Sequence, residues 1–314
     1  MTPSVLVTRR LPASALVKLE LRCDVDLHPG PNGLSPRALQ DRVKGKAGLV
    51  CLVTDRIDRA VIDAGTDLRV IANVAVGYDN VDARYARTRD VIVTNTPDVL
   101  TEATAEFTWG LILSITRRIT EGDRLVRAGR WKGWAFDFML GTELQGKRLG
   151  VVGPGRIGRA VAARAEAFGM DVVFAGTGTT SSSGQSVSLD ELLVTSNVVS
   201  LHVPMTEQTR HLIDRRALTR MKRTAYLVNL SRGTVVDEAA LVWALGQHLI
   251  AGAALDVYER EPAVHQDLLS FENVVLTPHL GSGTREARTA MAELAVANVV
   301  AVLGGKPPLT PVTP

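Results

Sequence analysis

The sequence predicts an α/β protein with two doubly wound parallel sheets, and three observations lead to this prediction. Short, valine-rich apolar runs alternate with helical patterns along most of the chain, as they do where helices connect parallel strands. A glycine-rich turn follows the first strand of a second such series, near residue 150. The chain has 314 residues, more than one compact core usually contains, so two domains are expected.

The first series occupies the N-terminal third of the chain. Helical patterns over residues 13–20 and 36–44 lie between its strands. The predicted strands are residues 5–8, 25–27, 48–53, 70–73 and 91–94. A long helical pattern over residues 101–120 starts with two threonines, Thr101 and Thr104, and we expect this helix to lead out of the first domain. A loop is predicted over residues 128–146.

The second series begins at residue 149 and predicts a doubly wound parallel sheet with right-handed connections. Its predicted strands are residues 149–152, 171–175, 198–201, 225–230, 253–257 and 274–277. The chain then ends in a long amphipathic helix over residues 285–303. Because no strand follows this helix, we expect it to return to the first domain. The expected domains are therefore residues 1–98 with 286–314, and residues 99–285.

Composition narrows the class of protein. Apolar residues make up 46% and charged residues 22% of the chain, as in ordinary globular proteins. The 36 basic and 33 acidic residues are interspersed, which argues against nucleic acid or an anionic membrane as a partner. The two cysteines, Cys23 and Cys51, suit reduced thiols in a cytoplasmic protein and no metal site. No secretory signal and no apolar run of membrane-spanning length is recognisable.

The glycine-rich turn predicts a dinucleotide site. Gly153, Gly155 and Gly158 form a GxGxxG pattern between an apolar strand and an alanine-rich helix. Gly153 permits the tight turn, Gly155 allows the backbone to approach a pyrophosphate, and Gly158 allows close packing of helix on strand. The N-terminus of the helix then offers N–H groups and partial positive charge to the phosphates. A glycine-rich turn without a ligand is the alternative.

Three polar residues follow late strands of the second sheet, where ligands of such sheets bind. They are Arg232, Glu261 and His279. Histidine can deliver a proton near neutral pH, and a carboxylate beside it favours its protonated form. Arginine offers a planar, permanently charged fork to a carboxylate. Their positions predict a ligand site at this edge of the second sheet.

The chain resembles the D-isomer specific 2-hydroxyacid dehydrogenase family over essentially its whole length. The resemblance rests on the turn described above, on Val76-Gly77-Tyr78-Asp79-Asn80-Val81-Asp82 and on His202-Val203-Pro204. It implies hydride transfer between a nicotinamide coenzyme and a small 2-oxo or 2-hydroxy acid. It also implies a flavodoxin-like substrate-binding domain and a Rossmann domain for the coenzyme.

Residues 73–80, 130–134 and 136–141 are most similar to glyoxylate and hydroxypyruvate reductases. A phosphoglycerate dehydrogenase-like enzyme and a catalytically idle NAD(H)-sensing protein remain alternatives. Formate dehydrogenases have glutamine where Glu261 stands, and phosphite dehydrogenases have lysine where Val76 stands, so both are disfavoured.

The resemblance assigns roles to individual residues. His279 is the acid, Glu261 orients it, and Arg232 binds the substrate carboxylate. The backbone N–H groups of Val76 and Gly77 form a second carboxylate anchor. A homodimer is implied, with the helix 101–120 and the following loop at the contact. Trp134 in that loop is expected either to reach the partner subunit's substrate site or only to be buried at the contact.

The resemblance also implies a coenzyme site. Asp256 is expected to accept from the nicotinamide amide, and Arg156 and Ile157 to offer backbone N–H groups to the pyrophosphate. The full expected set is Thr101, Gly153, Gly155, Arg156, Ile157, Gly158, Gly176, Thr177, His202, Val203, Pro204, Thr209, Leu230, Ser231, Asp256 and Gly281.

One position departs from the pattern of NAD-specific sites, which carry an acid at the end of the second strand for the ribose 2′-hydroxyl. Gly176 occupies that position, followed by Thr177, Gly178, Thr179, Thr180 and Ser181. Either NADP or NAD is compatible, and the missing acid favours NADPH. The connection up to Ser188 is short, so a truncated helix is expected there.

Overall fold

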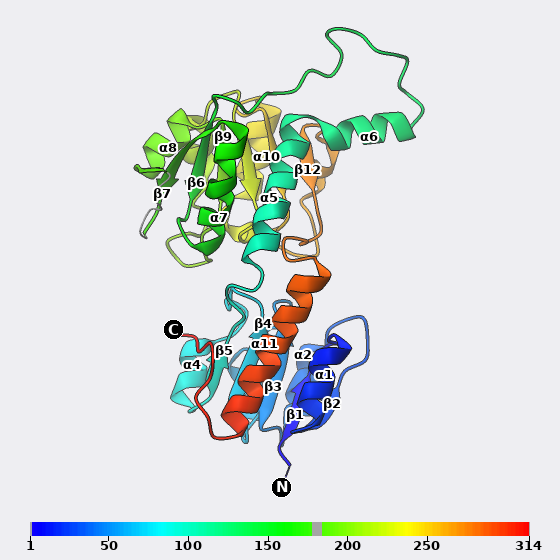
Figure 1. Ribbon diagram of the computed structural model, residues 1–314, viewed down its shortest axis with the longest axis vertical. Coiled ribbons are helices and arrows are strands. Elements are labelled where there is room, and N and C mark those ends of the chain that lie inside the picture. The colour runs from blue at the N-terminus through cyan, green and yellow to red at the C-terminus, as the bar shows by residue number, and fades with distance from the viewer. Residues whose placement is uncertain (1, 178–183, 314) are drawn as a thin grey trace. The chain divides into compact units, whose positions relative to one another are not determined.

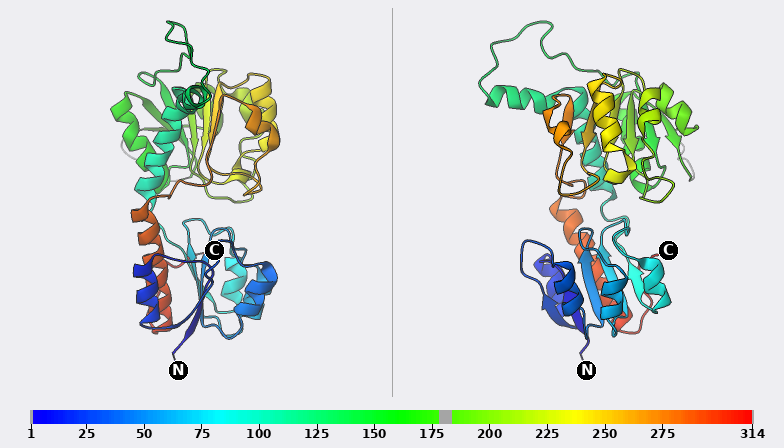
Figure 2. Two further views of the ribbon diagram at one scale, coloured as in Figure 1. Left: turned by 90° about the vertical axis from the view of Figure 1, so that its right-hand side faces the viewer. Right: turned by 180° about the vertical axis from the view of Figure 1, so that it is seen from behind.

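The computed structural model describes residues 2–177 and 184–313. The chain divides into two compact units: unit 1 comprises Met1–Leu100 and Thr284–Pro314, and unit 2 comprises Thr101–Gly283. Each unit contains one sheet with helices on both faces (Figures 1 and 2). All pairs of neighbouring strands within the two sheets run parallel. The α/β fold class expected from the sequence is therefore confirmed.

Unit 1 has the strand order β2-β1-β3-β4-β5. The strands are β1 Ser4–Val7, β2 Asp24–Leu27, β3 Gly48–Leu52, β4 Val70–Val74 and β5 Ile92–Thr94. The order reverses after β1, so the connecting helices cover both faces, as in flavodoxin-like folds. The helices are α1 Ala13–Glu20, α2 Pro36–Arg42, α3 Arg59–Ala64, α4 Ala83–Thr88 and α11 Arg285–Leu303.

The C-terminal helix α11 belongs to unit 1, where it packs against α1, β3 and β4. The opposite face of the sheet is covered by α2, α3 and α4, which contribute Leu39, Ile62 and Ala86 to the core. The helices α3 and α4 were not expected from the sequence. Each has six residues, too few for a clear helical period, and depends on an aspartate N-cap.

Unit 2 has the strand order β12-β11-β10-β9-β6-β7-β8. The strands are β6 Arg148–Val152, β7 Asp171–Ala175, β8 Gln185–Ser186, β9 Val198–Leu201, β10 Tyr226–Asn229, β11 Gly252–Leu255 and β12 Val274–Leu276. The order reverses between β6 and β9, and ligands of such sheets bind beyond the carboxyl ends of the strands at that reversal. The glycine-rich turn directly follows β6 and therefore lies there.

Two layers of helices cover this sheet (Figure 2). One face packs against α5 and α7, with Trp109, Ile112 and Ala162 in the core. The other packs against α8, α9 and α10, with Leu193, Leu218 and Leu241. The helices are α5 Thr101–Thr116, α6 Ile119–Arg127, α7 Arg156–Ala165, α8 Leu189–Thr195, α9 Arg215–Arg220 and α10 Glu238–Gly246, with short 3₁₀ helices η1 Glu166–Phe168, η2 Gly233–Val235 and η3 Gln266–Ser270.

The expectation of one continuous helix over residues 101–120 is wrong. Helix α5 ends at Thr116, whose carbonyl oxygen accepts a hydrogen bond from the Thr142 N–H at 2.7 Å. Arg118 then adopts a left-handed conformation, with φ of 55°, and α6 starts in a new direction. No residue of α6 is buried, and α6 with the following loop extends away from the sheet of unit 2 (Figure 1).

The short strand β8 was also not expected, and it pairs with β7. The polar residues Gly178, Thr179, Thr180 and Ser181, discussed above for coenzyme choice, lie outside the described residues. Among the helices that the structure describes, none combines the length and apolar character needed to cross a membrane.

Candidate active site

The glycine-rich turn has the backbone geometry that a bound pyrophosphate requires. Gly153 has a φ of 98°, and a Cβ there would lie 2.7 Å from the His202 carbonyl oxygen. A Cβ at Gly158 would lie 2.2 Å from the Gly153 carbonyl oxygen, so α7 can pack this closely only with glycine. At Gly155, by contrast, a Cβ would meet no atom within 4 Å. The N-terminus of α7 is thus open to a ligand, and these residues fit the coenzyme phosphates.

The neighbouring strand ends complete this part of the site. Gly176 follows β7, and a Cβ at this position would lie 3.3 Å from Pro154 Cδ. Thr177 beside it is exposed. The Thr209 hydroxyl donates to the Pro204 carbonyl oxygen at 2.7 Å, which fixes the turn after β9. The position where an acid would bind the ribose 2′-hydroxyl of the coenzyme, at the end of β7, therefore carries no carboxylate.

His202, at the end of β9, is placed for structure and not for proton transfer. Its Nε2 lies 2.8 Å from the Ser200 hydroxyl. Burial lowers the pKa of His202 to about 4. The imidazole is therefore neutral at neutral pH, and it adds no charge next to the glycine-rich turn.

His279 and Glu261 form a hydrogen-bonded pair. His279 Nδ1 lies 2.8 Å from Glu261 Oε2, and the other carboxylate oxygen accepts from the Tyr258 N–H at 3.0 Å. The His279 side chain is 32% exposed and that of Glu261 is 30% exposed. His279 has a φ of 56°, held by a 2.9 Å hydrogen bond from its N–H to the Asp256 carbonyl oxygen. Such a conformation is uncommon for a non-glycine residue and is concentrated at functional sites.

The surroundings of Glu261 favour its charged form. Burial alone would raise the pKa of Glu261, but the hydrogen bond from His279, the charge of His279, the Tyr258 N–H and the charge of Arg232 together lower it. Glu261 is therefore a carboxylate at neutral pH, and it orients the ring by accepting from Nδ1. This leaves Nε2 of His279 as the atom that can exchange a proton with a substrate.

Arg232 lies in the loop after β10, and a residue that sequence reasoning missed shapes this loop. Asn229, the last residue of β10, is 1% exposed. Its Nδ2 donates to the Arg232 carbonyl oxygen at 3.0 Å, and its Oδ1 accepts from both the N–H and the hydroxyl of Ser231. The positive charge of Arg232 helps to lower the pKa of Glu261, so Arg232 lies within electrostatic range of the His279–Glu261 pair. The signal available in the sequence was a polar residue, Asn229, directly after the apolar residues of a predicted strand.

Asp256 shapes the loop that carries His279. It is 1% exposed, and its carboxylate accepts from the Thr277 hydroxyl at 2.7 Å, the Leu280 N–H at 2.7 Å and the Gly281 N–H at 2.8 Å. A Cβ at Gly281 would lie 3.3 Å from Asp256 Oδ2 and 3.5 Å from Thr104 Cγ2. Asp256 and Gly281, both expected at the coenzyme, therefore lie together.

One further expected residue lies near this point of unit 2. A Cβ at Gly281 would lie 3.7 Å from Leu230 Cδ2, which brings Leu230 to the same place. Thr101 is the first residue of α5. The sequence reasoning missed Thr104, one turn after Thr101, which is buried beside Gly281. The helical spacing of the two threonines was the only signal for it.

Val76 and Gly77 lie in unit 1, in the loop that follows β4. Asn95 Nδ2 donates to the Val76 carbonyl oxygen at 2.7 Å, and Asn73 Nδ2 donates to the Gly77 carbonyl oxygen at 2.9 Å. The bond from Asn95 fixes the peptide plane that carries the Gly77 N–H. The plane that carries the Val76 N–H is fixed by the Ala75 carbonyl oxygen, which accepts from the Thr96 N–H at 2.8 Å. The role of their N–H groups as a carboxylate anchor stays a prediction.

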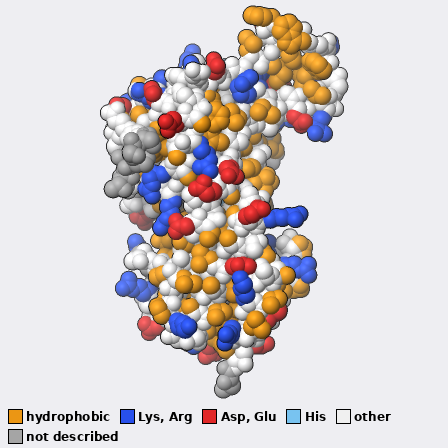
Figure 3. Space-filling model, viewed as in Figure 1, with side chains coloured by type: hydrophobic (Ala, Val, Ile, Leu, Met, Phe, Trp, Pro, Cys, Tyr) orange, Lys and Arg blue, Asp and Glu red, His pale blue; other side chains and the backbone are white. Residues whose placement is uncertain are grey.

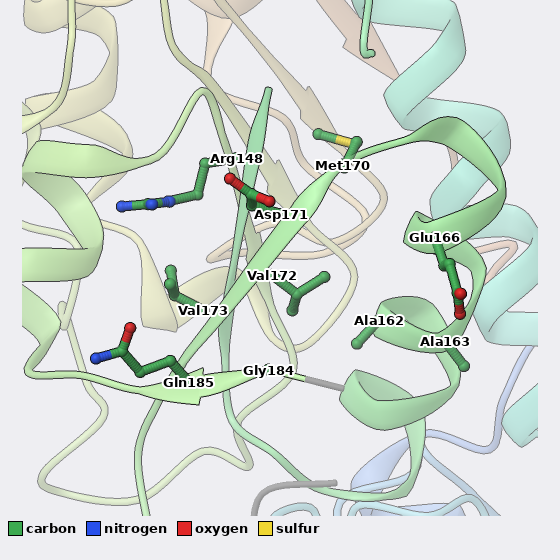
Figure 4. A pocket seen from close by; sticks show the side chains of 10 residues that line it. All are labelled: Arg148, Ala162, Ala163, Glu166, Met170, Asp171, Val172, Val173, Gly184 and Gln185. Carbon is green, nitrogen blue, oxygen red and sulfur yellow. The ribbon is translucent and has the colours of Figure 1, made fainter. Parts of the chain in front are cut away.

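A pocket of about 530 Å³ in unit 2 lies between α7, β7 and β8 (Figure 4). Arg148, Asp171 and Gln185 line it, and each is the first residue of its strand. The pocket therefore lies at the amino ends of the strands, opposite to the edge where ligands of parallel sheets bind. None of the predicted catalytic residues lines it.

Comparison with known proteins identifies relatives of the chain. Residues 109–281 match the family described as "D-isomer specific 2-hydroxyacid dehydrogenase, NAD binding domain". A glyoxylate reductase of Thermofilum pendens is 47% identical over 315 residues, which cover 98% of this chain and 93% of that protein.

Solved structures give the same result. A protein of Thermus thermophilus has a TM-score of 0.94 and 48% identity, covering 99% of this chain and 100% of that one. An NADPH-dependent glyoxylate/hydroxypyruvate reductase of Sinorhizobium meliloti, in complex with NADP and malonate, has a TM-score of 0.90 and 34% identity, covering 100% and 97%.

Proposed function

The chain belongs to the D-isomer specific 2-hydroxyacid dehydrogenase family, and we propose that it reduces glyoxylate or another small 2-oxo acid such as hydroxypyruvate. It is an NAD(P)-dependent oxidoreductase that transfers a hydride between the coenzyme and a 2-oxo or 2-hydroxy acid. The observation that carries the proposal is the His279–Glu261 hydrogen bond of 2.8 Å next to the charge of Arg232. The similarity to glyoxylate reductases supports the choice of a small substrate.

The three side chains divide the work of the reduction. When bound at the glycine-rich turn, NADPH or NADH would supply the hydride for the 2-oxo carbon. Arg232 binds the substrate carboxylate and stabilises the negative charge that develops on the neighbouring oxygen. His279 donates its Nε2 proton to that oxygen and so forms the hydroxyl group. Glu261 holds the Nδ1–H and stabilises the imidazolium before the transfer. In the reverse direction the neutral imidazole accepts the same proton.

The backbone N–H groups of Val76 and Gly77 are proposed to bind the substrate carboxylate as well. The hydrogen bonds from Asn95 to the Val76 carbonyl and from the Thr96 N–H to the Ala75 carbonyl support this, because they fix the peptide planes that carry the Gly77 and Val76 N–H groups. A loop whose N–H groups are oriented in advance binds an anion at a lower entropic cost than a mobile loop.

NADPH is the proposed coenzyme. Gly176 leaves no carboxylate at the end of β7 to repel a 2′-phosphate. One NADP-bound relative supports the same choice. Steady-state kcat/KM values for NADPH and NADH test it, and a clear preference for NADH would refute it.

Replacing His279 with alanine tests the proposed reaction. The variant should reduce glyoxylate about 10² to 10⁴ times more slowly, because the oxygen loses its proton donor. Binding of NADPH, measured by fluorescence titration, should remain within about twofold, because the phosphates bind at the glycine-rich turn. A panel of 2-oxo acids that includes 3-phosphohydroxypyruvate separates a small-acid reductase from a phosphoglycerate dehydrogenase-like enzyme. Wild-type protein that oxidised no reduced coenzyme with any acid of the panel would refute the proposal.

A homodimer is proposed, with the arm formed by α6 and residues 128–141 at the contact. Apolar side chains on this arm are exposed, including Trp134 at 82%, Phe136 at 87% and Leu140 at 66%. Figure 3 shows hydrophobic side chains gathered on the arm, and such patches commonly mark contacts between proteins. Light scattering should give twice the chain mass for the wild type and the mass of one chain after Phe136→Ser with Leu140→Ser. A monomeric wild type would refute the proposal.

Trp134 distinguishes two forms of this contact. If it reaches the substrate site of the partner subunit, Trp134→Ala raises the KM for glyoxylate in a protein that is still dimeric. If it is only buried at the contact, the variant changes the dimer dissociation constant and not the KM. A cytoplasmic location is also proposed, which the two buried, unpaired cysteines support.

A further inference from the structure

The loops that carry Arg232 and Glu261 are in direct backbone contact. They follow the neighbouring parallel strands β10 and β11. A Cβ at Gly233 would lie 1.8 Å from the Tyr258 carbonyl carbon and 2.3 Å from the Glu259 nitrogen. No side chain fits there, so the peptide after Arg232 lies against the segment that leads to Glu261. The separation of these two residues therefore depends on what holds the segments together.

Two glutamates hold them. Glu238 is the first residue of α10, on the Arg232 side, and Glu259 lies two residues before Glu261. The Glu259 N–H donates to Glu238 Oε1 at 2.8 Å, and the Glu238 N–H donates to Glu259 Oε1 at 3.0 Å. Each side chain thus accepts from the backbone of the other residue. We call this reciprocal pair the glutamate brace.

Burial and like charge disfavour the charged forms of the two carboxylates in the brace. Glu238 is 7% exposed, and burial and the charge of Glu259 raise the pKa of Glu238 against the effect of the Glu259 N–H, His265 and Arg260. Glu259 Oε1 also lies 3.1 Å from His211 Nε2. Two neighbouring carboxylates with little exposure stabilise a fold less than an apolar pair would. Packing alone does not explain this arrangement, whereas a requirement for fixed geometry does.

We propose that Glu238 and Glu259 are positioning residues that fix Arg232 relative to the Glu261–His279 pair. The consequence follows along the chain. Tyr258, next to Glu259, donates its N–H to Glu261 Oε1, so a movement of the Glu259 backbone displaces the carboxylate that orients His279. A displacement of about 1 Å in such a site can cost about 100-fold in rate. The assignment of a catalytic consequence rests on the proposed function.

The first experiment compares Glu238→Ala with Glu238→Gln. The alanine variant should lose about 10- to 100-fold in kcat/KM for glyoxylate, while its dissociation constant for NADPH stays within about twofold. The glutamine variant keeps an oxygen that accepts from the Glu259 N–H, and it should restore kcat/KM to within about fivefold of wild type. Wild-type kcat/KM in the alanine variant would overturn the proposal. So would an equal loss of NADPH binding, which would indicate a general structural role.

A second variant and a control keep the test decisive if Glu238→Ala does not fold. Glu259 is 22% exposed at its side chain, so Glu259→Ala is expected to fold even where Glu238→Ala does not, and the same losses are expected for it. Glu191→Ala, at an exposed first-turn position of α8, is the matched control and should match wild type.

Nitrogen NMR of ¹⁵N-histidine-labelled protein reports on the pair without turnover. The His279 resonance is identified by its absence in His279→Gln. It should shift towards that of a free imidazole in both brace variants and not in the control. An unshifted resonance in both would overturn the proposal, even if wild-type protein reduced no 2-oxo acid.

Discussion

Replacing Glu261 with glutamine should slow the reduction of the substrate. The substitution removes a negative charge 2.8 Å from His279 Nδ1 and keeps the length of the side chain. In the wild type the carboxylate accepts from the Nδ1–H and holds the ring with Nε2 free for the substrate. A glutamine side chain keeps a hydrogen-bonding group there but no charge, so it orients the ring less strongly. The variant should therefore transfer the proton more slowly.

The size of the loss follows from the distance and the exposure. A hydrogen bond to a charged group contributes about 1.5 to 3 kcal/mol when it is shielded from water, and exposed ion pairs contribute less than about 1 kcal/mol. The two side chains are 32% and 30% exposed, so an intermediate value of about 1.5 kcal/mol is appropriate. A barrier that is higher by about 1.4 kcal/mol makes a reaction about tenfold slower. The kcat/KM for glyoxylate should therefore fall about tenfold.

The assay is the initial rate of glyoxylate reduction at saturating NADPH near neutral pH. The variant should have a kcat/KM about tenfold below that of wild type, while its dissociation constant for NADPH stays within about twofold. Glu191→Gln, at an exposed position in the first turn of α8, is the control and should reproduce the wild-type kcat/KM. A variant with the kcat/KM of wild type would refute the role assigned to Glu261.

Three further predictions follow from the structure. Arg232→Lys keeps the charge but not the planar fork, so kcat/KM for glyoxylate should fall about 30- to 150-fold with NADPH affinity unchanged; a loss below about threefold would contradict bidentate binding. Gly158→Val should abolish NADPH binding in fluorescence titration, because a Cβ would lie 2.2 Å from the Gly153 carbonyl oxygen, and retained affinity would contradict the turn geometry. The pKa of His202 is about 4 when folded and near 6.5 when unfolded, so the unfolded chain binds more protons between these values and stability falls as pH drops from about 7 to about 5. In urea denaturation, the free energy of unfolding should fall by about 1 to 2 kcal/mol more in the wild type than in His202→Gln over this pH range. An equal fall in both proteins would contradict burial of the neutral ring.

The sequence predicted best what depends on local pattern. The valine-rich strands of both sheets were recognisable because buried parallel strands are apolar on both faces. The short helices α3 and α4 and the end of α5 were not, because six residues carry too little periodicity and the break at Arg118 depends on a tertiary hydrogen bond from Thr142.

Part of the candidate site was also recognisable. Arg232, Glu261 and His279 stand out as polar residues after apolar strands, and the fold places the carboxyl ends of those strands at one edge. Asn229, Thr104 and the glutamate brace were missed. Thr104 and the brace act through contacts with segments distant in sequence, and no spacing rule encodes such contacts. Asn229 acts on its own loop, through Ser231 and Arg232, but its burial is decided by the tertiary structure.

The amino-acid order alone determined the identity of the chemistry: an imidazole, a carboxylate, a guanidinium and a glycine-rich turn, each at the end of a strand. Only the tertiary structure decided that Glu261 accepts from His279 and that the Asp256 carboxylate accepts from N–H groups of the loop after His279. It also decided that Gly233 lies against Tyr258. The physical reason is that strand periodicity is a short-range property of the chain. The distances between loops arise from packing and hydrogen bonds between segments far apart in sequence.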